Sequence, residues 1–324
     1  CPGAVCQGSI YLGQATVSGG NWQLLPPFAG GVTLVGGESI TALAIDQSSL
    51  SSNTSEFAAC RTVLNLADCA NAQGEIFVTN ANDEGAGSLR YAIQCANFTP
   101  GPNTILFDLP SSSQHPIFVG ATSGEPLPTL TDPATIIDGS TQSGGRPVLD
   151  GSMADWNIPY NALFVQADSC GIFGLEIRSF PDDAIDITNA SAVTIGRAGA
   201  GNLIHSNGSE QDEFPGLPGT GPWEGSGIVL KGTTTGCVIQ GNILGLDAAG
   251  QAAGNEFCGI RIRDNASDHL IGGAEAGRGN TIAHQPNGIL LEGSAQRCEI
   301  YQNSLFCNTG HGIQLMSGAN QDMP

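Results

Sequence analysis

A short apolar motif recurs through the second half of the chain and constrains the fold more than any other feature. Each copy is a glycine followed by isoleucine, one further residue and a second apolar side chain, and successive copies begin 24 to 32 residues apart. The copies begin at Gly227, Gly259, Gly288 and Gly312, and an earlier variant begins at Ala184. Self-similarity at this period predicts a solenoid of stacked supersecondary units.

Each unit contains two further short apolar segments. The second segments are residues 192–195, 237–239, 269–271 and 298–300, and the third are residues 202–204, 242–244, 280–282 and 303–305. Three strands per unit, joined by Gly- and Asn-rich corners, predict the coils of an all-β, right-handed parallel β-helix. The asparagine that begins each third segment is expected to form a hydrogen-bonded ladder at a corner rather than a ligand site.

The region before the repeats predicts a cap for this β-helix. Ser88 is a candidate N-cap for a helix at 89–95, and strands are expected at 75–80, 104–107, 135–138 and 147–150. The first coil of a solenoid exposes strand edges and apolar side chains, so the helix is expected to cover that end.

Residues 1–70 lack the repeat and read instead as antiparallel β-structure with turns every eight to ten residues. The expected strands are 8–12, 14–17, 22–25, 31–34 and 40–45, with a further one at 61–64. The chain is therefore predicted to contain a partial β-sandwich at 1–70 and a β-helix at 71–324, with an N-terminal cap at 75–107.

Several segments resemble a family of large secreted bacterial right-handed parallel β-helix repeat proteins. They are residues 78–93, 103–107, 137–139, 271–273 and 278–280. Residues 8–63 resemble the end of the immunoglobulin-like domain that often follows the β-helix in that family. The resemblance implies an extracellular or cell-surface protein. Because the domain order is reversed here, it also implies copies of this chain joined head-to-tail, each sandwich being completed by a neighbouring unit.

Composition agrees with this reading. The net charge of −20 disfavours nucleic acid as a partner, and no apolar run is long enough to predict insertion into a membrane. The ten cysteines lack paired zinc-type spacing, so disulfides in an oxidising compartment are expected. The nearest pairs are Cys1 with Cys6, Cys60 with Cys69 and Cys298 with Cys307. Glycosylation acceptor sequences begin at Asn53, Asn97, Asn189, Asn207 and Asn265.

The catalytic candidates are weak. Asp182, Asp183 and His311 resemble pieces of the motifs of polygalacturonase-like hydrolases, in which carboxylates and a histidine act together. Here the histidine follows the carboxylates by four or five coils, which is about 20 Å at the spacing of adjacent strands. The sequence therefore predicts no catalytic site and no cofactor. Calcium is a further alternative, bound either by the aspartates at 182, 183 and 186 or by those at 264 and 268.

Three functions follow from these features. The favoured one is a non-enzymatic structural subunit or repeat of an extracellular filament or cell-surface array. The second is an adhesin that binds surface glycans through a loop at 206–224, with Phe214, Trp223 and Trp156 as its aromatic candidates. The third is a polysaccharide hydrolase or lyase of the parallel β-helix type.

Overall fold

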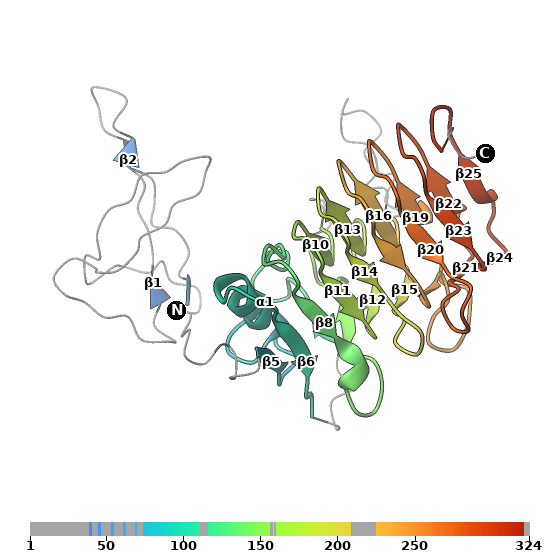
Figure 1. The fold of residues 1–324 in the computed structure, drawn as a ribbon. Helices are drawn as coiled ribbons and strands as arrows, with labels where there is room; N and C mark the ends of the chain where they lie inside the picture. The colour runs from blue at the N-terminus through green and yellow to red at the C-terminus, as the bar shows by residue number, and fades with distance from the viewer. Residues whose placement is uncertain are drawn as a thin grey trace. The chain divides into compact units, whose positions relative to one another are not determined.

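The computed structural model describes Cys69 and residues 74–110, 116–155, 158, 160–208 and 225–320, together with four short strands further upstream (Figure 1). The chain divides into two compact units, residues 1–69 and residues 70–324.

In the first unit, the described residues form two antiparallel strand pairs. Strand β1 (Ser39–Ile40) pairs with β4 (Arg61–Thr62), and β2 (Ile45–Asp46) pairs with β3 (Asn53–Thr54). The other strands expected in this unit lie outside the described residues. The immunoglobulin-like sandwich therefore stays a prediction.

In the second unit, the described residues form three parallel sheets stacked coil upon coil (Figure 1). The eight-stranded sheet contains, in spatial order, β5 (Glu75–Val78), β6 (Thr104–Phe107), β8 (Ile136–Asp138), β11 (Gly171–Phe173), β14 (Thr194–Ile195), β17 (Val238–Ile239), β20 (Leu270–Gly272) and β23 (Glu299–Tyr301). The seven-stranded sheet contains β7 (Ile117–Phe118), β9 (Val148–Asp150), β12 (Glu176–Arg178), β15 (Leu203–His205), β18 (Ile243–Leu244), β21 (Thr281–Ala283) and β24 (Ser304–Phe306). The six-stranded sheet contains β10 (Leu163–Val165), β13 (Ile185–Thr188), β16 (Ile228–Lys231), β19 (Cys258–Ile262), β22 (Asn287–Leu291) and β25 (His311–Leu315). This is the all-β parallel β-helix that the repeat predicts.

The strands stack in a register that places identical side chains above one another. On the eight-stranded sheet a column of isoleucines occupies the paired positions 76, 105, 137, 172, 195, 239, 271 and 300. All but the last are buried, and complete burial of one such side chain stabilises the fold by about 1.5 to 3 kcal/mol. The isoleucines of the Gly-Ile motif form a second column on the six-stranded sheet, at the paired positions 185, 228, 260, 289 and 313, and all but the last are buried.

Two ladders of side-chain amides run along the corners. In the first, the backbone N–H and the Nδ2 of each asparagine donate to Oδ1 of the next one, at 2.9 to 3.0 Å, through Asn202, Asn242, Asn280 and Asn303. This confirms the predicted ladder. A second ladder, which the sequence pattern did not predict, runs through Asn207, Asn255, Gln285 and Asn308.

One α-helix lies at the β5 end of the rod (Figure 1). Helix α1 (Leu89–Phe98) begins at the predicted cap, where the Ser88 hydroxyl accepts a hydrogen bond from the Tyr91 N–H, and it ends three residues later than expected. Its Leu89 and Ile93 side chains are buried, as the amphipathic pattern predicts. The helix therefore provides the expected cap.

The carboxylate of Asp83 fastens this cap to the loop before β8. It accepts hydrogen bonds from the backbone N–H groups of Gly120, Thr122 and Ser123, and it pairs with Arg90 of α1 at 2.9 Å. Burial alone raises the pKa of Asp83, but the donors from Ser123, Arg90 and Gly120 outweigh burial and lower the pKa to about 2.

Disulfide pairing differs from the nearest-neighbour prediction. Cys69 is bonded to Cys95 of α1, so the predicted pairing with Cys60 is wrong. Cys298 and Cys307 are both free. Cys298 is buried at the start of β23, whereas Cys307 is exposed at the corner after β24, so the two thiols belong to different sides of one coil. Cys1 and Cys6 lie outside the described residues.

The remaining free thiols are core side chains. Cys170, Cys237 and Cys258 are buried, and the first two occupy the corner position immediately before β11 and β17. The equivalent position before β20 is His269, whose Nδ1 accepts a hydrogen bond from the Cys237 N–H at 3.1 Å. These cysteines are buried side chains of the β-helix, so short sequence spacing between cysteines carries no information about bonding here.

The last coil is open. Strands β23, β24 and β25 are each the last strand of their sheet. Leu291 is fully buried and Leu315, which pairs with it one coil further on, is 52% exposed; Ile289 and Ile313 show the same contrast, from 0% to 44%. Tyr301, Phe306 and Met316 of the same coil are also exposed. Among the described residues, the rod is thus covered at the β5 end and uncovered at the β25 end.

Candidate functional site

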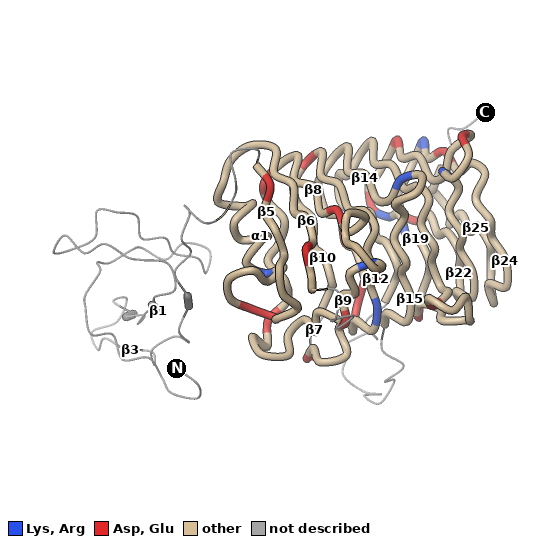
Figure 2. Tube along the Cα trace, turned by 90° about the horizontal axis from the view of Figure 1, so that it is seen from below, with Lys and Arg blue, Asp and Glu red and all other residues tan. Residues whose placement is uncertain are grey.

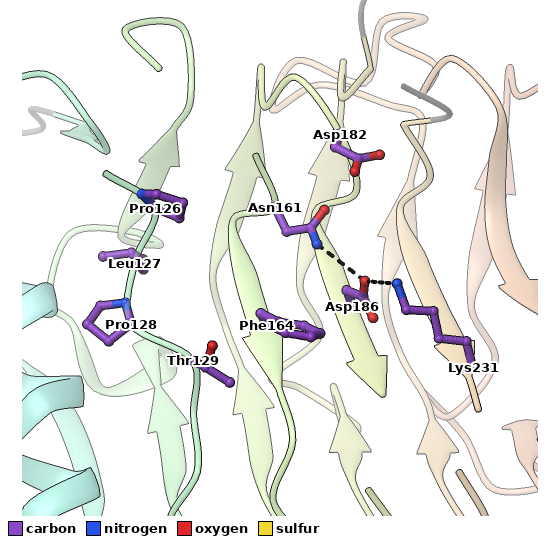
Figure 3. A pocket seen from close by; sticks show the side chains of 9 residues that line it. All are labelled: Pro126, Leu127, Pro128, Thr129, Asn161, Phe164, Asp182, Asp186 and Lys231. Carbon is purple, nitrogen blue, oxygen red and sulfur yellow. Dashed lines mark hydrogen bonds and ion pairs between the residues drawn. The ribbon is translucent and has the colours of Figure 1, made fainter. Parts of the chain in front are cut away.

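A pocket of about 510 Å³ opens on the outer face of the six-stranded sheet, near its β10 edge (Figure 3). We call it the Lys231 pocket. Its lining residues are Pro126, Leu127, Pro128, Thr129, Asn161, Phe164, Asp182, Asp186 and Lys231.

Coil stacking brings these residues together. Phe164 on β10 pairs with Asp186 on β13, and Thr188, two residues further along β13, pairs with Lys231 on β16. Side chains two residues apart on a strand share a face, so the phenyl ring, the carboxylate and the ammonium group all lie on the outside of the sheet. Figure 3 shows Asn161 and Lys231 pointing toward Asp186 from either side.

Asp186 is the centre of a hydrogen-bonded network. Its carboxylate is 1% exposed and accepts bonds from Lys231 Nζ at 2.5 Å, Asn161 Nδ2 at 3.2 Å and Thr188 Oγ1 at 2.8 Å. Asn161 Oδ1 in turn accepts from the backbone N–H of Asp183 at 3.1 Å. Both ends of the Asn161 amide are therefore fixed, and Asp186 holds Lys231 in place over the pocket.

The opposite wall of the pocket is held from behind by α1. The segment 126–129 runs into Leu130, which bridges to Val165 of β10 in parallel. Arg90 donates to the carbonyl oxygen of Pro126 at 2.5 Å, and Asn97 donates to that of Thr129 at 2.7 Å. The helix that caps the rod thus also positions one side of the pocket.

Asp183 lies behind the pocket and differs electrostatically from its neighbours. It is buried, and its carboxylate accepts the Ser226 N–H at 2.8 Å. Burial, followed by repulsion from Asp182, raises the pKa of Asp183 well above its usual range, and the Ser226 N–H only partly opposes this. Asp186, whose carboxylate pairs with Lys231, and Asp183, whose pKa is raised, therefore lie in different electrostatic environments.

The catalytic fragments of the sequence do not meet. Asp182 lines the Lys231 pocket and Asp183 lies behind it, whereas His311 is exposed on β25. Four strand steps separate β13 from β25 in the six-stranded sheet, which corresponds to about 19 Å. The histidine therefore lies outside the reach of the carboxylates, as the spacing predicts.

Other predicted residues fall in different places. Phe214, Trp223 and Trp156 lie outside the described residues, so the aromatic adhesin loop stays a prediction. Within the described part of the chain, no group of three acidic, histidine or cysteine side chains converges to hold a metal ion. Asp264 instead accepts the Gly232 N–H, and Asp268 pairs with Arg297 at 2.6 Å.

The glycosylation candidates differ in accessibility. Asn207 is 1% exposed and its Nδ2 donates along the second amide ladder, so its nitrogen is not available for modification. Asn97 uses its amide to hold residues 129–132. Asn189 and Asn265 are exposed. Nothing is described of the Asn53 side chain.

Among the described residues, the basic side chains do not follow one another in a continuous band (Figure 2). In Figure 2, basic residues are few and scattered among more numerous acidic ones along the described part of the second unit. The basic side chains form local pairs, such as Arg261 with Glu292 and Arg178 with Asp150. No helix among the described residues has the length and hydrophobicity needed to cross a membrane.

Sequence reasoning missed the Lys231 pocket. Its walls come from four segments separated by more than 100 residues at the extremes, and the coil that contains Asn161 and Phe164 lacks the Gly-Ile motif. One signal was present: Lys231 is the only lysine of the chain, and it directly follows the Gly-Ile motif that begins at Gly227.

Comparison with known proteins adds no identification: no protein-family model and no curated protein matches this chain.

Proposed function

We propose that this protein is a non-enzymatic structural unit of an extracellular filament or surface array, in which copies join head-to-tail. The open last coil supports this proposal. Side chains that are fully buried in the preceding coil, such as Ile289 and Leu291, have counterparts at Ile313 and Leu315 that are about half exposed. Contiguous exposed apolar surface of this kind marks an interaction site.

The occupant of this surface is a second copy of the same chain. Strands β23, β24 and β25 each offer one unpaired edge, which can accept a further strand by β-augmentation. At the other end of the rod, α1 covers the first coil, so two rods cannot stack directly. The partner surface is therefore assigned to residues 1–69 of the next copy, the unit with antiparallel strands. A contact between two different surfaces that does not close gives a filament.

The extracellular location rests on the Cys69–Cys95 disulfide and on the resemblance to secreted repeat proteins. The polysaccharide hydrolase or lyase alternative receives less support, because His311 lies about 19 Å along the sheet from the carboxylates of Asp182 and Asp183.

Light scattering on the full chain over a wide concentration range tests the assembly. The proposal expects the mean mass to rise with concentration without a plateau. The double variant Ile313→Lys, Leu315→Lys is expected to remain monomeric, because burying an unpaired lysine ammonium group in an apolar interface is costly. The matched control Phe118→Lys changes an exposed apolar residue on β7 and should assemble normally.

Two outcomes contradict the proposal. A single-chain mass at every concentration excludes self-assembly. A plateau at two copies indicates a closed contact between two last coils instead of an open head-to-tail array.

A further inference from the structure

The Lys231 pocket has no part in the proposed assembly, since it lies near the β10 edge and not on the last coil. Its volume of about 510 Å³ falls in the range of small-molecule sites. It also combines an aromatic ring, an amide, a carboxylate and an ammonium group on one face. The Lys231 pocket therefore has the size and the mixture of groups of a small-molecule site.

The polar groups at this site are fixed before any ligand arrives. Asp186 is almost fully buried, and its carboxylate oxygens accept hydrogen bonds from Lys231, Asn161 and Thr188. Asp186 is therefore a positioning residue. An ammonium group has three N–H donors and a primary amide has two, so Lys231 and Asn161 each retain donor capacity that can be directed into the pocket.

The apolar side of the site is flat. The Phe164 ring is partly exposed on the outer face of β10, and Pro126 and Pro128 line the opposite wall (Figure 3). A hexose presents C–H groups on the faces of its ring and hydroxyl groups at its edge. The phenyl and proline surfaces suit the former, and the donors of Lys231 and Asn161 with the carboxylate of Asp182 suit the latter.

The charges of the pocket disfavour acidic ligands. Asp182 and Asp186 line it together with a single lysine, and the chain as a whole carries a net charge of −20. A carboxylated sugar entering this pocket meets more negative than positive charge. We propose that the Lys231 pocket binds a neutral saccharide unit, with Phe164 as its stacking platform and Lys231 and Asn161 as its donors.

Titration calorimetry on the full chain tests this inference. The probes are oligosaccharides of neutral hexoses and of N-acetylhexosamine, with uronic acid oligosaccharides of matched length as the charged comparison. At least one neutral probe is expected to bind, and its uronic acid counterpart is expected to bind at least tenfold more weakly. Phe164→Ala and Lys231→Met should each lower the affinity about tenfold, because each removes about one good contact.

Phe118→Ala is the control, since it removes an exposed phenyl ring from a different sheet. It should leave the affinity unchanged. Lys231→Met also perturbs Asp186, so Phe164→Ala, which touches no ion pair, decides the case if the lysine variant unfolds. The inference is overturned if no neutral probe binds, if uronic acid probes bind equally well, or if Phe164→Ala binds like the unaltered chain.

Discussion

The ammonium nitrogen of Lys231 lies 2.5 Å from Oδ2 of Asp186, across the boundary between β13 and β16. The two partners are unequally buried: the Asp186 side chain is 1% exposed, whereas that of Lys231 is 26% exposed. This inequality predicts an asymmetric response to substitution. When its partner is removed, a charged group that can rotate into solvent lowers the free energy of unfolding little, whereas a charged group that stays buried lowers it much.

Lys231→Met is therefore expected to lower the free energy of unfolding by about 3 kcal/mol, because it leaves the Asp186 carboxylate buried with only neutral donors. Asp186→Asn is expected to cost about 1 kcal/mol, because Lys231 can rotate toward solvent and the new amide can still accept a hydrogen bond. Urea denaturation of both variants and of the double variant measures the difference. Equal losses for the two single variants would refute this account of the pair.

The raised pKa of Asp183 predicts a pH-dependent stability. A carboxyl group whose pKa is higher in the folded than in the unfolded chain destabilises the fold progressively as pH rises above about 4. Asp183→Asn removes this penalty and keeps an oxygen that can accept the Ser226 N–H. The variant is expected to be more stable than the unaltered chain at pH 7 and to lose that advantage below pH 4.

Thermal unfolding at a series of pH values measures this difference. Asp264→Asn is a suitable control, because Asp264 is exposed and also accepts a backbone N–H, that of Gly232. An Asp183→Asn chain that is less stable than the unaltered one at pH 7 would show that the charge of Asp183 is needed.

The amide ladder predicts a position-dependent cost. Asn242 is 1% exposed, accepts from Asn202 and donates to Asn280, so Asn242→Ala leaves buried donors and acceptors unpaired on both sides. The expected loss is about 3 kcal/mol, since each buried unsatisfied group costs about 1 to 3 kcal/mol. Asn303, at the end of the ladder, is partly exposed, and Asn303→Ala should cost about 1 kcal/mol. Chemical denaturation measures the free energy of unfolding of both variants. If the ladder did not stabilise the fold, both variants would show equal, small decreases.

The cap disulfide predicts a redox-dependent stability. The Cys69–Cys95 bond closes a loop of roughly 25 residues, which in the chain-entropy model is worth about 3 kcal/mol. Replacing both cysteines by serine should lower the melting temperature and make it insensitive to reducing agent. Cys307→Ser, which alters an exposed free thiol, should change neither property. An unaltered chain whose melting temperature ignores reduction would contradict the pairing.

The fold of the second unit could be predicted from the sequence because its core repeats. Isoleucine recurs at every coil, and its register partners are also isoleucine, so one pattern specifies strand, face and neighbour together. The N-cap at Ser88 was equally readable, because a serine hydroxyl before an amphipathic run has a single local use.

Features that depend on the stacking of unlike segments could not be predicted in this way. The second ladder escaped notice because Gln285 replaces an asparagine and its members follow irregular spacings. The coil from β10 to β12 has Ala162 and Leu163 where later coils have the Gly-Ile motif, so neither it nor the Lys231 pocket was found. The disulfide pairing was predicted wrongly for a related reason. Most of the described cysteines are core residues, so a short spacing between two cysteines does not indicate a bond.

The native thiol of Cys307 allows the most direct test of head-to-tail assembly. Cys307 is exposed in the last coil, whereas the other free thiols of the described chain are buried, and burial raises the pKa of Cys237 and Cys258 to about 12. The quantity to measure is the rate at which iodoacetamide alkylates Cys307. Peptide mass spectrometry gives this rate at each of a range of protein concentrations. If the last coil is covered by the next copy, the rate falls as concentration rises, and the Ile313→Lys, Leu315→Lys chain keeps the fast rate throughout. A rate that is the same at all concentrations in the unaltered chain would contradict the account.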